Sequence, residues 1–226
     1  LVSIILMSVF INREKEIELL KERYESDRAE FVIIYGRRRV GKTELIERFL
    51  SLKNVNGFRL LAREESKALQ LRRFKKIVAE YFKDPLLESV EFADWDAFFE
   101  YISKRCERER VVVAIYEFPY LVKEDRSLPS ILQDFWDRKL KNTKIFLILC
   151  GSSISMMEKL MGYKSPIYGR RTGQILVKPL GFVDVAKYIS DVKRAVELYS
   201  VFGGTPAYLM AVSYTHLRAH ETSLHL

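Results

Sequence analysis

Histidine and cysteine are scarce in this sequence, and their positions exclude several kinds of chemistry. All three histidines (His216, His220 and His225) fall within the last eleven residues, without the spacing of zinc ligands. The two cysteines, Cys106 and Cys150, also lack metal-type spacing and predict reduced core thiols in a cytoplasmic protein. We therefore expect neither a metal cluster nor a disulfide framework.

Long apolar runs are missing as well. The apolar opening Leu1–Ile11 is interrupted by Ser3 and Ser8, and it is shorter than the roughly 20 residues that a membrane-spanning helix needs. It also lacks the basic beginning of a signal peptide. The sequence thus predicts no membrane partner, and a natural start at Met7 with Leu1–Leu6 upstream of it.

The composition is that of a globular protein, with 48% hydrophobic and 30% charged residues in a chain of 226. The net charge of +8 is unevenly spread, because residues 31–83 carry 14 lysines and arginines against five acidic residues. Such a block attracts phosphates, on a nucleotide or on nucleic acid. The competing interpretation of Arg72, Arg73, Lys75 and Lys76 is a solvated helical face.

Short apolar runs alternate with amphipathic segments along the chain. Strands are predicted at 31–35, 57–62, 111–115, 144–150 and 174–177. Helices are predicted at 12–24 with Asn12 as cap, 42–50, 69–82, 95–102 with Asp94 as cap, 128–140, 154–161, 183–190 and 192–202. This alternation predicts an α/β fold with a mainly parallel sheet covered by helices on both faces.

The segment Gly36–Thr43 matches the phosphate-binding pattern G-x-x-x-x-G-K-[ST] at every fixed position, between a predicted strand and a predicted helix. The glycines allow backbone N–H groups to point at phosphate oxygens, Lys42 reaches the β- and γ-phosphates, and the Thr43 hydroxyl ligates Mg²⁺. The pattern predicts a site for ATP and Mg²⁺. Its binding residues are Gly36, Arg37, Arg38, Arg39, Val40, Gly41, Lys42 and Thr43.

The three arginines of this loop, Arg37–Arg39, occupy variable positions of the pattern. They either point into solvent or add positive charge at the mouth of the nucleotide site. The sequence does not decide between these interpretations.

A carboxylate follows the third predicted strand. Glu117 is a catalytic candidate that would polarise the attacking water, and an ordinary surface glutamate is the alternative. The position before it, where an aspartate would hold a magnesium-bound water, is Tyr116. A phenol has a pKa of about 10 and is neutral at pH 7, so it is a poor partner for that water.

Two further groups of polar residues lie beyond the third strand. Ser152 and Ser153 follow the fourth strand, where a hydroxyl can contact the γ-phosphate or cap the next helix, and both interpretations stay open. Arg170, with Arg171, is a candidate for stabilising transition-state charge, in its own site or across a subunit interface. The alternative is a pair of surface arginines.

Taken together, the chain resembles the archaeal-type ATPase family of P-loop proteins, within the broad AAA+/STAND group, from about Phe10 to about Leu209. The phosphate-binding pattern is specific alone, and the ordered set of motifs is specific to the family. The motifs are Phe10-Ile11-Asn12-Arg13-Glu14-Lys15-Glu16, Gly36–Thr43, Glu117-Phe118-Pro119-Tyr120-Leu121, Leu149-Cys150-Gly151-Ser152-Ser153, Tyr168-Gly169-Arg170-Arg171 and Phe202-Gly203-Gly204-Thr205-Pro206-Ala207-Tyr208-Leu209.

The resemblance implies a three-layer P-loop NTPase core, here residues 7–180, with a strand inserted between the phosphate-loop strand and the strand that precedes Glu117. Residues 181–212 would begin a helical lid, and 213–226 look like a non-native tail. Family members usually continue into winged-helix and nuclease-like domains, so we interpret this chain as a fragment. A nucleic-acid partner would then bind through the missing domains, and a homo-oligomer is compatible with the family.

Three functions are compatible with these features. The leading one is ATP binding and Mg²⁺-dependent hydrolysis that couples nucleotide state to conformational change. The second is a nucleotide-gated switch with little hydrolysis, because Tyr116 replaces the expected aspartate. The third is a DNA-associated ATPase module, suggested by the basic block at 31–83. A GTPase is disfavoured because no N/T-K-x-D signature follows the fourth strand.

Overall fold

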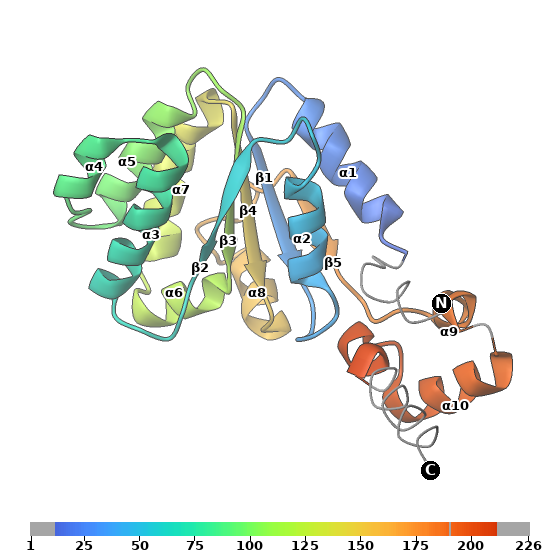
Figure 1. Ribbon diagram of the computed structural model, residues 1–226. Helices are drawn as coiled ribbons and strands as arrows, with labels where there is room; N and C mark the ends of the chain where they lie inside the picture. Colours follow the sequence, from blue (N-terminus) through green and yellow to red (C-terminus); the bar gives the residue numbers. More distant parts are fainter. Residues whose placement is uncertain (1–11, 190, 212–226) are drawn as a thin grey trace, which may run out of the picture.

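The computed structural model describes residues 12–189 and 191–211 (Figure 1). The predictions about Leu1–Leu6, the start at Met7, and the tail at 213–226 with its histidines lie outside these residues. Within the described part of the chain, no helix has the length and apolarity needed to cross a bilayer.

Five parallel strands form the central sheet in the order β2-β3-β4-β1-β5. They are β1 (Glu30–Tyr35), β2 (Gly57–Leu61), β3 (Val111–Tyr116), β4 (Ile145–Gly151) and β5 (Gly173–Leu176). Every residue of β1, β3 and β4 is buried, as expected for continuous apolar runs in a sheet covered on both faces. The parallel sheet is confirmed, and so is the inserted strand, because β4 lies between β1 and β3.

Helices cover both faces of this sheet, which confirms the three-layer fold (Figure 1). Side chains that alternate along β1 enter different cores: Phe31 and Ile33 point to one side, Val32 and Ile34 to the other. The first core is covered by α3 (Lys67–Phe82), α5 (Trp95–Arg105), α7 (Leu128–Arg138) and α8 (Ile154–Met161). The second is covered by α1 (Glu14–Glu25) and α2 (Lys42–Leu50).

The helix ends show where the local signals were right and where they were wrong. Asp94 caps α5 as predicted, accepting a hydrogen bond from the Ala97 N–H at 2.8 Å. Asp84 ends α3 but also caps a short helix, α4 (Pro85–Ser89), that was not predicted. The prediction of Asn12 as a cap was wrong: α1 begins at Glu14, Arg13 holds the cap position, and Asn12 has a positive φ of 47°.

Two other differences lie near the third and fourth strands. Helix α7 ends at Arg138, and a short 3₁₀ turn, Leu140–Asn142, completes the segment that was predicted as one helix. A further helix, α6 (Phe118–Glu124), follows β3 directly and was not predicted. Both cysteines are buried free thiols, as expected.

The C-terminal part has a small core of its own. Helices α9 (Phe182–Tyr188) and α10 (Val192–Phe202) pack around Leu180, Val185 and Leu198, separately from the two cores beside the sheet. This confirms a small helical C-terminal part (Figure 1). The boundary between residues 180 and 181 stays a prediction, and so does a lid function for these helices.

A buried carboxylate fixes the beginning of β1. The Glu30 side chain is 1% exposed and accepts hydrogen bonds from Arg23 at 3.0 Å, Ser26 at 3.0 Å, Arg28 at 3.2 Å and the Thr172 hydroxyl. Burial alone would raise the pKa of Glu30, but these hydrogen bonds outweigh it and hold the pKa below its ordinary value of 4.5. The network joins the end of α1 to Thr172, the residue before β5.

We predict that Glu30→Gln lowers the free energy of unfolding by about 2 kcal/mol near neutral pH, since hydrogen bonds to a charged group are lost. Because the folded-state pKa is depressed, this stabilisation is present above about pH 4.5 and is lost as the pH falls through the folded-state pKa. Denaturant unfolding of both proteins across this range should therefore show a difference that shrinks in acid. Glu22→Gln, on the exposed face of α1, is the control; a difference that does not change with pH would contradict the assignment.

Candidate functional site

The turn between β1 and α2 depends on two glycines with positive φ, 153° at Gly36 and 96° at Gly41. A Cβ atom on Gly36 would lie 2.3 Å from the Val177 carbonyl oxygen, so only glycine lets the loop approach the chain after β5 this closely. A Cβ atom on Gly41 would meet no atom within 4 Å, so glycine is required there by backbone conformation alone. Residues 36–43 thus form the tight turn that the pattern predicts.

Lys42 folds back over this turn. Its ammonium group donates to the carbonyl oxygens of Gly36 and Arg37, both at 2.8 Å, and the residue is 7% exposed. Burial lowers the pKa of Lys42 below its ordinary value, while the nearby Cys150 and Glu117 oppose that shift. The loop therefore holds a buried cation beside the N-terminus of α2, where backbone N–H groups favour anions.

Glu117 and Ser152 come together although they are 35 residues apart. The Glu117 carboxylate accepts hydrogen bonds from the Ser152 hydroxyl at 2.8 Å and from the Ser152 backbone N–H at 3.2 Å. Glu117 follows β3 and has a φ of 51°, at the beginning of α6. The alternative role of Ser152 as a helix cap is not found, since Ser153 occupies the cap position of α8 without a side-chain hydrogen bond.

Tyr116 points into the core on the α2 side of the sheet. It is 5% exposed, and its hydroxyl group is buried without a hydrogen-bond partner among the described residues. Burial raises the pKa of Tyr116 far above its ordinary value, so the phenol is neutral across the physiological range.

The residues present fit Mg²⁺ only in part. Thr43 is exposed at the first turn of α2 and can offer its hydroxyl, and the Glu117 carboxylate lies close enough to the neighbouring Lys42 to raise its pKa. Tyr116 adds no charge at the position where a second carboxylate was expected. In the part of the chain that the structure describes, no group of three histidine, cysteine, aspartate or glutamate residues is arranged as a metal site.

The loop arginines are exposed, but two of them contact aromatic side chains. Arg38 donates to the Tyr120 hydroxyl of α6 at 3.0 Å, and the Arg39 guanidinium lies 5.3 Å from the ring centroid of Tyr208, beyond α10. The sequence indicated neither contact. Residues 36–43, referred to below as the phosphate loop, are thereby connected to α6 on one side and to the C-terminal helices on the other.

Arg170 is not brought to Lys42 and Glu117. Its guanidinium forms a bidentate ion pair with Asp137, near the end of α7, and donates to the Pro166 and Tyr168 carbonyl oxygens. Thr172, two residues further on, donates its backbone N–H to the Phe31 carbonyl oxygen near the beginning of β1. The phosphate loop follows the opposite end of that strand. The structure thus does not support a role for Arg170 in the site of its own chain.

The basic block at 31–83 does not form one surface. Lys42 and Lys75 are buried, and several cations of the block, Lys75 among them, have carboxylate partners. These pairs are Arg59–Glu47, Lys67–Asp125, Arg73–Glu65 and Lys75–Glu91. Most of the excess charge on α3 is therefore neutralised locally, which favours the interpretation as a solvated helical face.

The structure shows contacts of one residue that the sequence indicated only as part of the motif Phe10–Glu16. Arg13 is 8% exposed and donates to the Val40 carbonyl oxygen at 3.2 Å, the Lys178 carbonyl oxygen at 2.5 Å and the Glu16 carboxylate at 3.1 Å. It therefore joins the beginning of α1, the phosphate loop and the segment after β5. An arginine among charged residues at a helix start has no local pattern that indicates burial.

The sequence is similar to known proteins of one family. The family described as the ATPase domain predominantly from Archaea matches residues 10–212. An uncharacterised protein of Methanocaldococcus jannaschii is 39% identical over 207 residues, which is 90% of this chain and 44% of the relative. An uncharacterised ATP-binding protein of the same organism is 47% identical over 47 residues, 21% of this chain and 80% of the relative. The chain thus spans less than half of the longer relative.

Solved structures share the fold at low sequence identity. The Walker-type ATPase of Pyrococcus abyssi has a TM-score of 0.68 at 20% identity, over 92% of this chain and 68% of that one. The ORC2 protein of Aeropyrum pernix in its ADP form has a TM-score of 0.66 at 12% identity, over 96% of this chain and 67% of that one.

We predict that Arg13→Gln loosens the phosphate loop without unfolding the chain. Losing two carbonyl contacts should raise amide hydrogen exchange at residues 36–43 and 178–180 by ~10-fold, the equivalent of about one charge-assisted hydrogen bond. Mass spectrometry of exchanged peptides measures this. Glu16→Gln, which keeps both carbonyl contacts, should leave the two segments protected; equal exchange in both variants would rule out a clamp by Arg13.

Proposed function

The chain belongs to the family of ATPase domains found predominantly in Archaea, and we propose that it binds ATP with Mg²⁺, hydrolyses it and couples nucleotide state to conformational change. One observation carries the proposal: the Lys42 ammonium and the Ser152-bound Glu117 carboxylate lie at the same edge of the sheet, beside the N-terminus of α2. The site therefore combines a loop that can bind phosphate with a carboxylate that can orient the attacking water.

In the proposed binding mode, phosphate oxygens replace the carbonyl partners of Lys42 and receive hydrogen bonds from the N–H groups of residues 36–43. Thr43 would offer its hydroxyl to the metal. Bound Mg²⁺ would neutralise charge on the phosphates. The low exposure of Lys42 strengthens its attraction for them, because the effective dielectric constant is smaller away from water.

Glu117 is proposed to orient the attacking water and to accept its proton. The two hydrogen bonds from Ser152 hold the carboxylate in place. Ser152 is therefore a positioning residue, and a change in its hydrogen bonding would transmit the state of the γ-phosphate to β4. A role for Arg170 in the site of a neighbouring copy stays a prediction.

A nucleotide-gated switch with slow hydrolysis is the second candidate, and the neutral, buried Tyr116 phenol favours it. The contacts of Arg38 with Tyr120 and of Arg39 with Tyr208 offer such a switch two routes from the loop to the rest of the chain. A DNA-associated module has weaker support, since Lys42 is buried and three cations of α3, Lys67, Arg73 and Lys75, are paired with carboxylates.

We predict that Tyr116→Asp increases phosphate release by ~10-fold or more, because a carboxylate there can hold a magnesium-bound water; tenfold corresponds to about 1.4 kcal/mol of the barrier. Tyr116→Asn is the uncharged control and should not increase the rate.

Lys42→Ala should weaken ATP affinity ~10–100-fold through loss of a charge-assisted contact. Turnover is measured by phosphate release and affinity with a fluorescent ATP analogue. If the unaltered chain and Lys42→Ala bind ATP equally, the phosphate-loop assignment fails.

We predict different effects for the two residues of the Glu117–Ser152 pair. Glu117→Gln should keep ATP affinity and reduce turnover ~100-fold or more, since the general base is lost. Ser152→Ala should reduce turnover by a smaller factor, because the carboxylate remains but is held by fewer hydrogen bonds. Single-turnover phosphate release separates chemistry from binding. A Glu117→Gln protein with unchanged turnover would show that another group polarises the water.

A further inference from the structure

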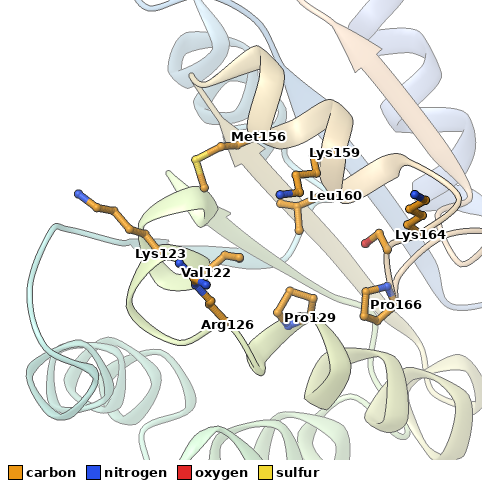
Figure 2. A pocket seen from close by; sticks show the side chains of 10 residues that line it. Val122, Lys123, Arg126, Pro129, Met156, Lys159, Leu160, Lys164 and Pro166 are labelled. Carbon is orange, nitrogen blue, oxygen red and sulfur yellow. The ribbon is translucent and has the colours of Figure 1, made fainter.

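A groove of about 490 Å³ lies between α8, the end of α6 and the beginning of α7, outside the nucleotide site (Figure 2). Figure 2 shows Lys159 and Leu160 on the α8 side and Val122 on the α6 side. Helix α6 begins directly after Glu117, and α8 begins two residues after Ser152. The two walls of the groove therefore continue from the two strands that carry the candidate site.

The charged side chains of the groove are all cationic. Four lysine or arginine residues line it, and no carboxylate does among the described residues. Lys123 is paired with Glu64, but Arg126, Lys159 and Lys164 are exposed and have no ion-pair partner within the part of the chain that the structure describes. Three unneutralised cations around one depression attract an anionic partner.

The floor of the groove is apolar. It is formed by Val122, Met156, Leu160 and two prolines, Pro129 and Pro166, without an aromatic ring from the described residues. Aliphatic walls of this kind accept a bulky apolar side chain. Single-stranded nucleic acid is instead bound mainly by aromatic rings on which bases stack, and the lining of this groove offers none.

We propose that this groove docks an acidic peptide segment of a partner protein, in which carboxylates flank a bulky aliphatic side chain. The aliphatic side chain lies on Met156 and Leu160, and the carboxylates contact Arg126, Lys159 and Lys164. Docking does not depend on the proposed ATPase function, because none of these residues belongs to the phosphate loop or to the Glu117–Ser152 pair.

The test uses the full chain and a short fluorescein-labelled peptide of alternating glutamate and leucine, measured by fluorescence anisotropy without nucleotide. Arg126→Glu combined with Lys159→Glu should weaken binding ~10-fold or more, because both contacts become repulsive. Arg72→Glu combined with Lys76→Glu is the matched control, since it makes the same charge change on exposed residues of α3. The control should bind as the unaltered chain does.

The apolar contact is tested separately. Met156→Ala, or serine in place of leucine in the peptide, should weaken binding ~5-fold, as expected for about 1 kcal/mol of lost apolar burial. Absence of peptide binding, or equal weakening by the two charge-reversal variants, would overturn the proposal. Tighter binding of a labelled oligo-dT strand, lost in Arg126→Glu with Lys159→Glu, would also overturn it and assign the groove to nucleic acid.

Discussion

Parallel strands place all their carboxyl ends at one edge of a sheet, and the chemistry proposed for this chain depends on that constraint. Strand β1 delivers the phosphate loop to this edge, β3 delivers Glu117, and β4 between them delivers Ser152. The inserted strand separates Lys42 from Glu117 and supplies the hydroxyl that orients the carboxylate. Arg170 does not lie at this edge, because the chain runs back toward the beginning of β1 and Arg170 forms an ion pair there with Asp137.

Burial keeps two titratable groups of the candidate site neutral. Burial raises the pKa of the Cys150 thiol to about 12 and that of the Tyr116 phenol further still. Burial lowers the pKa of Lys42 most, and the charges of Glu117, which raises this pKa, and Arg38, which lowers it, act on the same ammonium group. A nucleotide would add its negative charge beside these groups, and Thr43 would help to hold the counter-ion.

The fold and the phosphate loop could be predicted because their determinants are local. Apolar runs reveal buried strands, and the two glycines of Gly36–Thr43 reveal the turn between strand and helix. The contacts of Arg13 could not be predicted, since they join residues 27 and 165 positions apart. Helix α6 has one local signal in the sequence, because Pro119 lies in its first turn, where proline is favoured. To predict the pairing of Glu117 with Ser152, the order of the strands in the sheet is needed as well as the residue types.

The backbone at Glu117 has a consequence for how this sequence can evolve. A left-handed conformation costs a residue with a Cβ about 1 kcal/mol relative to glycine, and asparagine tolerates it better than glutamate does. Glycine or asparagine would lower this backbone cost, but either change would remove the glutamate carboxylate that accepts two hydrogen bonds from Ser152. Backbone strain and hydrogen bonding therefore oppose each other at position 117, and the proposed chemistry adds a separate reason for glutamate to persist there.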